Sequence, residues 1–175
     1  MSRHTLAVLV NNQPGVLARV AALFSRRGFN IESLAVGPTE EPSLSRMTIV
    51  VNVEEQALEQ VSKQLNKLID VLRIVEMPAA SGFERELLLI KLDLTKASRD
   101  NLVTLSAPFD ARIVDEDDAS ITFELTSTRE QLEQLLAIFN ADWILELVQS
   151  GMVALQRGTS TLITPRFTQQ RAEQA

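Results

Sequence analysis

Apolar positions in the first 77 residues follow two periodicities. Short apolar or β-branched runs predict four strands, at 5–10, 30–36, 45–53 and 70–76. Apolar side chains recur every three or four residues in two other segments, which predicts amphipathic helices at 15–27 and 54–68. Gly28 directly follows the first of these, where a helix C-terminal glycine belongs. The predicted order of elements is therefore β-α-β-β-α-β.

This order is typical of the ferredoxin-like class, in which two helices cover one face of a four-stranded antiparallel sheet. The other face of the sheet then needs a cover as well, since an apolar sheet face is not stable in water. We expect a second copy of the chain, meeting this sheet by its edge or face, to supply that cover.

The second half of the chain repeats the pattern after a segment of small and turn-forming residues, Met77–Gly82. Strands are predicted at 86–94, 111–114, 120–125, 143–148 and 152–155, and helices at 96–105 and 128–139. Two pairs fit capping boxes, Asn52 with Glu55 and Ser127 with Glu130. The fold class is therefore α+β, with two ferredoxin-like βαββαβ units, each an antiparallel sheet with helices on one face. We place these units at 1–77 and 84–158, with a linker at 78–83 and a fraying polar tail at 159–175.

Composition and charge narrow the classes of function. The 175 residues carry a net charge of −6, so the chain as a whole repels a phosphate backbone and general nucleic-acid binding is disfavoured. The basic doublet Arg26-Arg27 is interpreted as a solvated helix end, favoured by the helix dipole. There is no cysteine, and no apolar run approaches the roughly 18 residues of a membrane span. No secretory signal precedes the first strand, so we expect a cytoplasmic protein.

Few side chains are available for catalysis. His4 is the only histidine, and tyrosine and cysteine are absent, which argues against a nucleophilic triad. We interpret His4 as an exposed side chain without a function. The acidic turn 115–118 offers oxygen ligands, and whether it binds a cation stays open at this point. No glycine-rich phosphate loop is present. The chain is therefore predicted not to be an enzyme.

The segment 11–17 carries the most informative chemistry. A strand ends and a helix begins within it, Pro14 fixes φ, and Gly15 lets another group approach the backbone. The unpaired N–H groups of a first helical turn favour a bound carboxylate. Asn12 could accept from the ammonium group of a ligand, or it could cap the helix itself. Asn30 is either a plain turn residue or an amide that faces a neighbouring chain.

The segment 12–17 (NQPGVL) resembles the N-x-x-G-x-L turn of ACT domains, amino-acid-binding regulatory modules with βαββαβ topology. The string between Phe24 and Thr48, with RGFNIESL and then LSRMT, is more specific. It is similar to the small, regulatory subunits of acetolactate synthase, also called acetohydroxyacid synthase. Asp70–Arg73 continues this resemblance, and Glu84–Glu86 looks like the start of the C-terminal domain of that family.

The resemblance implies a function. Such subunits lack synthase activity, activate the large catalytic subunit in branched-chain amino acid biosynthesis, and confer allosteric feedback inhibition by valine, with leucine or isoleucine as further effectors. In that family the effector lies between the ACT domains of a homodimer. The glycine turn of one chain contacts it, and the Asn-Ile pair of the other chain completes the site. Leu17 and Leu34 are candidate apolar walls beside Ile31. Carried over, the effector-binding residues here are Asn12, Gly15, Val16, Leu17, Asn30 and Ile31.

The resemblance also implies that this chain holds no cofactor. Thiamine diphosphate, Mg²⁺ and FAD are expected on the catalytic partner, and neither nucleic acid nor membrane is an expected partner. Three alternatives remain at this point. They are an ACT-type regulator with another effector, a small ferredoxin-like enzyme, and an RNA-binding module of the RRM type. The RRM interpretation needs aromatic side chains on the central strand, and Met47–Val51 has none.

Overall fold

The computed structural model describes residues 2–78 and 82–163. The chain divides into two compact units. The first comprises the chain up to Phe83 together with the residues from Ala154 onward, and the second is Glu84–Val153. The return of Ala154 to the first unit differs from the sequence-based boundaries, which placed 154–158 in the second. Across the described residues, no helix is long and apolar enough to cross a lipid bilayer.

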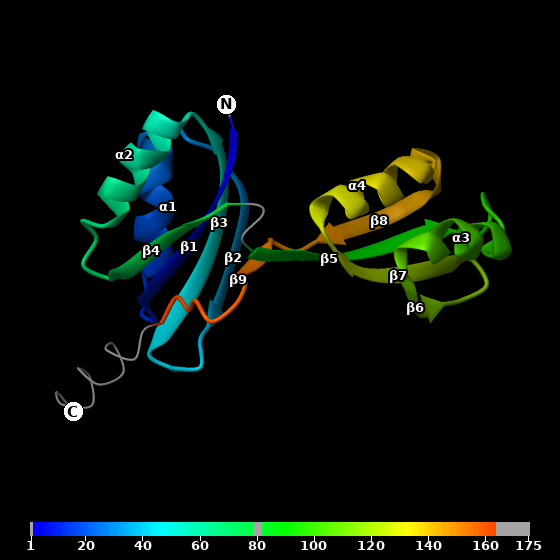
Figure 1. Cartoon of the computed structure of the whole chain (residues 1–175). Coiled ribbons are helices and arrows are strands. Elements are labelled where there is room, and N and C mark those ends of the chain that lie inside the picture. Colours follow the sequence, from blue (N-terminus) through cyan, green and yellow to red (C-terminus); the bar gives the residue numbers. More distant parts are fainter. Residues whose placement is uncertain (1, 79–81, 164–175) are drawn as a thin grey trace. The chain divides into compact units, whose positions relative to one another are not determined.

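The first unit has the predicted βαββαβ order. Its elements are β1 (Ser2–Asn11), α1 (Val16–Arg26), β2 (Ile31–Pro38), β3 (Leu44–Val53), α2 (Glu55–Leu65) and β4 (Val71–Met77). All strand pairs are antiparallel, and the spatial order is β2-β3-β1-β4. The two helices lie next to each other on one face of the sheet (Figure 1). The fold class predicted from the sequence is confirmed.

The helix-covered face of this sheet is a dry core. Leu6 and Val8 in β1 pair with Ile49 and Met47 in β3, so these side chains share one face. Phe24 of α1 packs into the same cluster and is 1 % exposed. Burying one such side chain contributes about 1.5–3 kcal/mol. The spacing of apolar residues in the two helices therefore reflects their contact with this core.

The ends of the helices test the predicted caps. Gly28 has φ +69°, and its N–H donates to Ser25 O just past the end of α1, so the predicted C-terminal glycine is confirmed. The capping box at Asn52 is wrong, because α2 follows Glu54 and has no side-chain cap. The box at Ser127 is also wrong. Thr128, one residue later, accepts from the N–H of Gln131 at the start of the helix.

The opposite face of the first sheet is covered in part by the chain's own C-terminal segment, 154–163 (orange to red in Figure 1). The Arg46 side chain in β3 donates to Ala154 O at 2.6 Å. The Arg73 side chain in β4 donates to Leu162 O at 3.1 Å, and Leu162 is 6 % exposed. Both arginines pair with Leu9 and so share the face away from the helices. A second copy is therefore not needed for all of this cover, and the predicted polar tail packs at least to Leu162.

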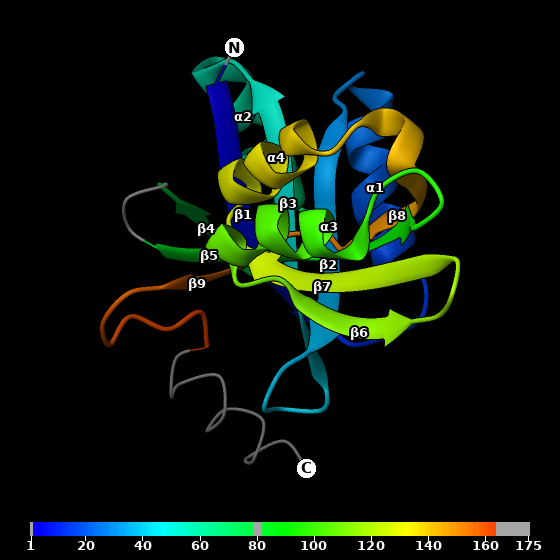
Figure 2. The same ribbon diagram turned by 90° about the vertical axis from the view of Figure 1, so that its right-hand side faces the viewer.

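The second unit repeats this topology. It contains β5 (Gly82–Asp93, whose first two residues belong to the first unit), α3 (Arg99–Ser106), the 3-10 turn η2 (Ala107–Phe109), β6 (Arg112–Glu116), β7 (Ser120–Ser127), α4 (Arg129–Ile138), η3 (Ala141–Trp143) and β8 (Ile144–Gln149). The order β6-β7-β5-β8 corresponds to β2-β3-β1-β4, and β9 (Val153–Gln156) adds to β5. Leu102 of α3 and Leu132 of α4 join one core with Phe123 of β7. Figure 2 shows α3 and α4 on the same side of β7.

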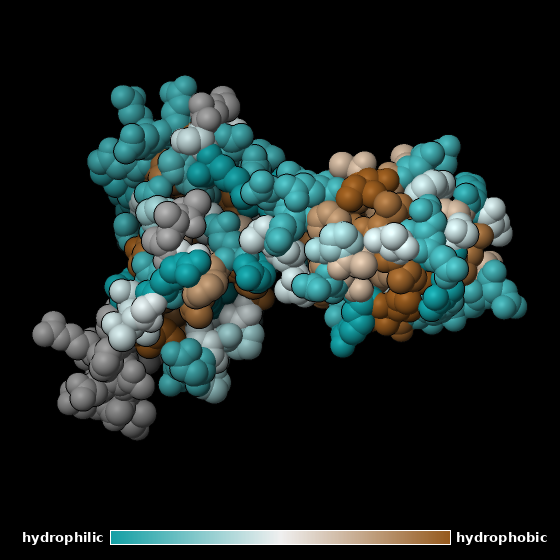
Figure 3. All heavy atoms as spheres, turned by 45° about the vertical axis from the view of Figure 1, so that its right-hand side comes forward, coloured by the Kyte–Doolittle hydropathy of each residue, from teal (hydrophilic) through white to brown (hydrophobic). Residues whose placement is uncertain are grey.

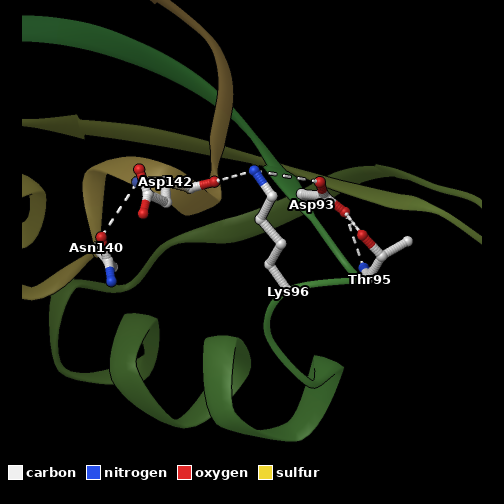
Figure 4. A network of polar contacts seen from close by, with 5 residues as sticks. All are labelled: Asp93, Thr95, Lys96, Asn140 and Asp142. Carbon is white, nitrogen blue, oxygen red and sulfur yellow. Dashed lines mark hydrogen bonds and ion pairs between the residues drawn. The ribbon is translucent and has the colours of Figure 1, made fainter.

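A polar network closes one end of this unit. Asp93 at the end of β5 accepts from both the hydroxyl and the N–H of Thr95 (Figure 4). These bonds, chiefly that of the hydroxyl, hold the pKa of Asp93 below its usual value. Lys96 donates to Asp142 O at 2.8 Å and so ties this end of β5 to the segment before β8.

Apolar side chains also remain on the surface of the second unit (Figure 3). The large apolar side chains exposed there are Leu87, Val114, Ile138, Leu145, Leu147, Val148 and Val153.

Candidate functional site

The turn between β1 and α1 has an open helix N-terminus. Gly15 precedes the helix with φ +82°, a left-handed conformation that glycine adopts without strain. No side chain caps α1. The N–H of Val16 donates to Gln13 O at 3.4 Å, a long bond, and helix geometry leaves the next two N–H groups without a partner inside the helix. Donors aimed out of the helix end form a site suited to a carboxylate.

Asn12 does not cap the helix. Its backbone N–H donates to Ser43 O at 2.8 Å and its side-chain Nδ2 donates to Pro42 O at 3.0 Å. Both bonds hold the turn against the loop between β2 and β3. The side-chain oxygen takes no part in them, so it is the atom that suits an ammonium group. Of the two roles open for Asn12 in the sequence, the structure therefore excludes self-capping.

Arg19 is a site residue that sequence reasoning missed. Its guanidinium Nη1 lies 3.0 Å from where a Cβ on Gly15 would stand, so a positive charge borders the turn. Asp70, 11 % exposed in its side chain, holds this guanidinium by an ion pair of 2.5 Å. The only signal for Arg19 in the sequence was local: it follows Gly15 by four residues, in the first turns of the predicted helix. Asp70 is 51 residues away from Arg19 and gave no signal.

The two apolar residues of the turn differ in where they lie. Val16 is 3 % exposed and belongs to the core, so only its backbone is available to a ligand. Leu17 is 43 % exposed and can form an apolar wall. The helical spacing of apolar residues already placed Val16 on the inner face of the helix, and it was the family resemblance that grouped it with Leu17 as effector-binding.

The other predicted residues lie at the far end of α1. Asn30 is exposed just before β2, and Ile31 packs against the core of its own unit, as does Leu34. Between the Gly15 turn and Asn30 runs α1 with 11 residues, a length of about 16 Å at 1.5 Å per residue. One chain therefore does not bring the two predicted halves of the site together. Asn30 directly precedes β2, an edge strand of the sheet.

Two carboxylates of the acidic turn 115–118 are engaged in contacts within the chain. Asp117 accepts from the N–H groups of Ala119 and Ser120, which keeps its pKa below the usual value. Glu116 pairs with Arg99 at 2.6 Å. Within residues 2–78 and 82–163, no group of three His, Asp or Glu side chains is placed to hold a metal ion.

His4 differs from the exposed side chain expected from the sequence. Its side chain is 13 % exposed and its Nδ1 lies 2.8 Å from Glu76 Oε1, so it links β1 to β4. Its other ring nitrogen lies 2.9 Å from the Ser2 hydroxyl, so a hydroxyl, an imidazole and a carboxylate follow one another here.

Comparison with known proteins identifies the family. Residues 6–73 match the model of the ACT domain of acetohydroxyacid synthase small subunits, and residues 85–158 match the model named small subunit of acetolactate synthase. The acetolactate synthase small subunit of Mycolicibacterium smegmatis is 52 % identical over 155 residues, covering 89 % of this chain and 91 % of that protein. The chain belongs to the acetolactate synthase small subunit family. Members of this family are regulatory subunits, which implies that a catalytic subunit is their partner.

Two more distant relatives agree with this family assignment. A probable acetolactate synthase small subunit of Archaeoglobus fulgidus is 49 % identical, with coverage of 89 % of this chain and 98 % of that protein. The crystal structure of the Thermotoga maritima small subunit superposes with a TM-score of 0.84 at 33 % identity, over 91 % of this chain and 100 % of that one. The family assignment favours a regulatory subunit over the RNA-binding and stand-alone enzyme alternatives.

Proposed function

We propose that this chain activates the thiamine-diphosphate-dependent catalytic subunit of acetolactate synthase and makes it sensitive to valine, without being catalytic itself. The observation that carries the proposal is the uncapped turn at Gly15, with Arg19 beside it, in an ACT unit of this family. Helix N–H groups and a guanidinium suit the carboxylate of an amino acid. The cofactors of the synthase reaction would then belong to the catalytic partner.

A homodimer would complete the effector site. Strand β2 stands at the edge of the sheet, next to β3 in the order of the described strands, so a second copy could pair along its outer edge. Two copies of β2 that pair antiparallel about a two-fold axis place the start of one against the end of the other. Asn30 directly precedes β2. The loop after its end, at Pro42 and Ser43, is the one that binds Asn12. Asn30 of one copy would thus approach the Gly15 turn of the other.

The side chain of the effector supplies the selectivity. Leu17 is the exposed apolar residue of the turn, and it would contact the branched side chain across the interface. Each buried methylene contributes about 0.8 kcal/mol, so valine would bind roughly tenfold more tightly than alanine, which is two carbons smaller. Leucine and isoleucine are further candidate effectors, because the same wall would take them.

Feedback inhibition then follows from differential binding. A ligand that bridges two chains favours the dimer arrangement in which the bridge fits. Valine inhibits only if that arrangement activates the catalytic subunit less than the valine-free one does. The proposal therefore couples the Gly15 turn of one copy and Asn30 of the other to the state of the catalytic partner.

The test is an activity assay with the purified catalytic subunit of the same organism. Adding this chain should raise the rate of acetolactate formation, and valine should then lower it. The catalytic subunit alone should be insensitive to valine, and this chain alone should form no acetolactate. The proposal fails if the chain leaves the rate and its valine response unchanged, or if the chain alone makes product.

A further inference from the structure

A groove with a positive rim runs between α1 and α2 on the outer side of the helices of the first unit. Its volume is about 680 Å³. The floor is apolar and includes Leu23 of α1 and Leu68, which follows α2. The rim carries four cations, Arg19, Arg26, Arg27 and Lys67. Figure 1 shows the two helices next to each other with no other labelled element over them.

The positive charge of this groove stands out because the chain as a whole has a net charge of −6. No Asp or Glu lines the groove, and α1 contains no acidic residue. Arg27 bonds to the neutral amide of Gln60 at 3.3 Å. In the part of the chain that the structure describes, no ion pair joins Arg26, Arg27 or Lys67 to a carboxylate. In the described residues these three cations therefore lack a carboxylate partner. Each lies at or just past the C-terminus of its helix, where the helix dipole favours positive charge, so the two helix ends gather their cations on one groove.

An exposed apolar side chain directly follows two residues of the groove in the sequence. Ile69 comes after Lys67 and Leu68 and is 91 % exposed. Together with the apolar floor, it would offer apolar contact to a protein partner. A small anion would gain nothing from it.

We propose that this groove docks an acidic segment of the catalytic subunit that also carries apolar side chains, an inference that rests on the proposed function. The carboxylates of such a segment would pair with the rim, and its apolar residues would meet the floor and Ile69. A second copy of this chain is a poorer occupant. Its net negative charge is spread over its whole surface, and two copies are expected to pair through β2 instead. Nucleic acid is disfavoured by the overall negative charge.

Arg19 connects this surface to the effector turn. Its guanidinium borders Gly15 and also forms part of the rim. A carboxylate bound at the turn would interact with the same guanidinium group that faces the groove. The effector site and the docking surface would therefore share one residue, which gives the bound amino acid a short path to the partner.

The test reverses single charges on the rim. Arg26→Glu and Lys67→Glu are compared with Lys63→Glu, a matched control on α2 that does not line the groove and is 67 % exposed in its side chain. The readout is the concentration of this chain that gives half-maximal activation of the catalytic subunit. Each rim variant should raise this concentration about tenfold at low salt, and less at high salt, while the control stays near wild type. Arg26→Lys should restore the wild-type value.

The outcomes separate this inference from the proposed function. If the wild-type chain does not activate the catalytic subunit, the proposed function fails. If it activates, and the rim variants do so at the wild-type or control concentration, the docking surface is wrong. Saturable binding of inorganic phosphate that Arg26→Glu removes, with unchanged activation, would assign the groove to a small anion instead. Circular dichroism of each variant checks that the fold is intact.

Discussion

At the residue scale, Gly15 combines two requirements that no other residue type meets together. Its φ of +82° is strained for an L side chain, and a Cβ there would approach the Arg19 guanidinium to 3.0 Å. The proline and glycine of this turn were visible in the sequence, and so was the helix that follows. The neighbouring positive charge was not, because it depends on the rotamer that Asp70 imposes on Arg19.

Gly15→Asp should abolish the valine response and preserve activation. The new carboxylate would stand beside Arg19 and the first-turn N–H groups, where the effector's own carboxylate is proposed to bind. The half-inhibitory valine concentration of the holoenzyme should rise at least about tenfold, since a lost charge interaction at a helix N-terminus is worth up to about 2 kcal/mol.

Gly158→Asp is the matched control for this variant. Gly158 also has positive φ, +74°, but no atom lies within 4 Å of its Cβ position. It therefore carries the same backbone strain without reaching the turn, and it should keep the valine response. A wild-type response in Gly15→Asp, or an equal loss in both variants, would remove the turn from the effector site.

At the element scale, the strands and helices followed from periodicity, and the C-terminal segment did not. The predicted strands and helices lie within a few residues of the observed ones, because burial on one face sets the spacing of apolar residues. The segment 154–163 is held largely through its backbone carbonyls, which accept from Arg46 and Arg73. Backbone acceptors are the same in every residue type, so this contact leaves no pattern in the sequence.

The caps show a second limit of the same kind. Asn52 and Ser127 each had an acidic residue three positions later, but their helices begin after Glu54 and Thr128. Ser127 is not the cap because β7 continues two residues beyond the predicted strand 120–125, whereas Asn52 already lay within the predicted strand 45–53. Ser2 pairs with Val53, and Glu86 pairs with Ser127, so both candidate caps remain in strands.

Arg46→Ala should weaken the packing of the C-terminal segment. The half-buried guanidinium donates to Ala154 O at 2.6 Å, and burial lowers its pKa from the usual value, so it stays in place only with such a partner. Losing a charged hydrogen bond of this kind costs about 1.5–3 kcal/mol in the free energy of unfolding. Urea denaturation measures this cost.

The control is Arg112→Ala, in a surface pair with Glu124. Arg112 is 71 % exposed in its side chain, so its loss should cost less than about 1 kcal/mol. Equal stability of the Arg46 and Arg112 variants would show that the segment 154–163 adds nothing to the first unit.

At the scale of the whole molecule, one topology occurs twice with different chemistry. The helix-covered cores are separate, one around Phe24 and the other around Phe123. Helices α1 and α3 both lack a side-chain cap, but among the described residues only α1 has a left-handed glycine before it. The corresponding helix α3 starts at Arg99 after Ser98, without a glycine in left-handed conformation. Shared topology was readable from the sequence. Composition and spacing gave no relation between the two candidate halves of the site, which lie at opposite ends of α1, and only the family resemblance implied that a second copy joins them.

The central claim is that a branched-chain amino acid binds where the Gly15 turn of one copy meets Asn30 of another. Calorimetric titration of the purified chain with valine tests it most directly, with alanine as the smaller ligand. The account predicts saturable valine binding, roughly tenfold weaker binding of alanine, loss of both in Asn30→Ala, and retention in Asn66→Ala, another exposed Asn of the same unit. Full valine binding by Asn30→Ala, or no valine binding by the wild-type chain, would contradict it.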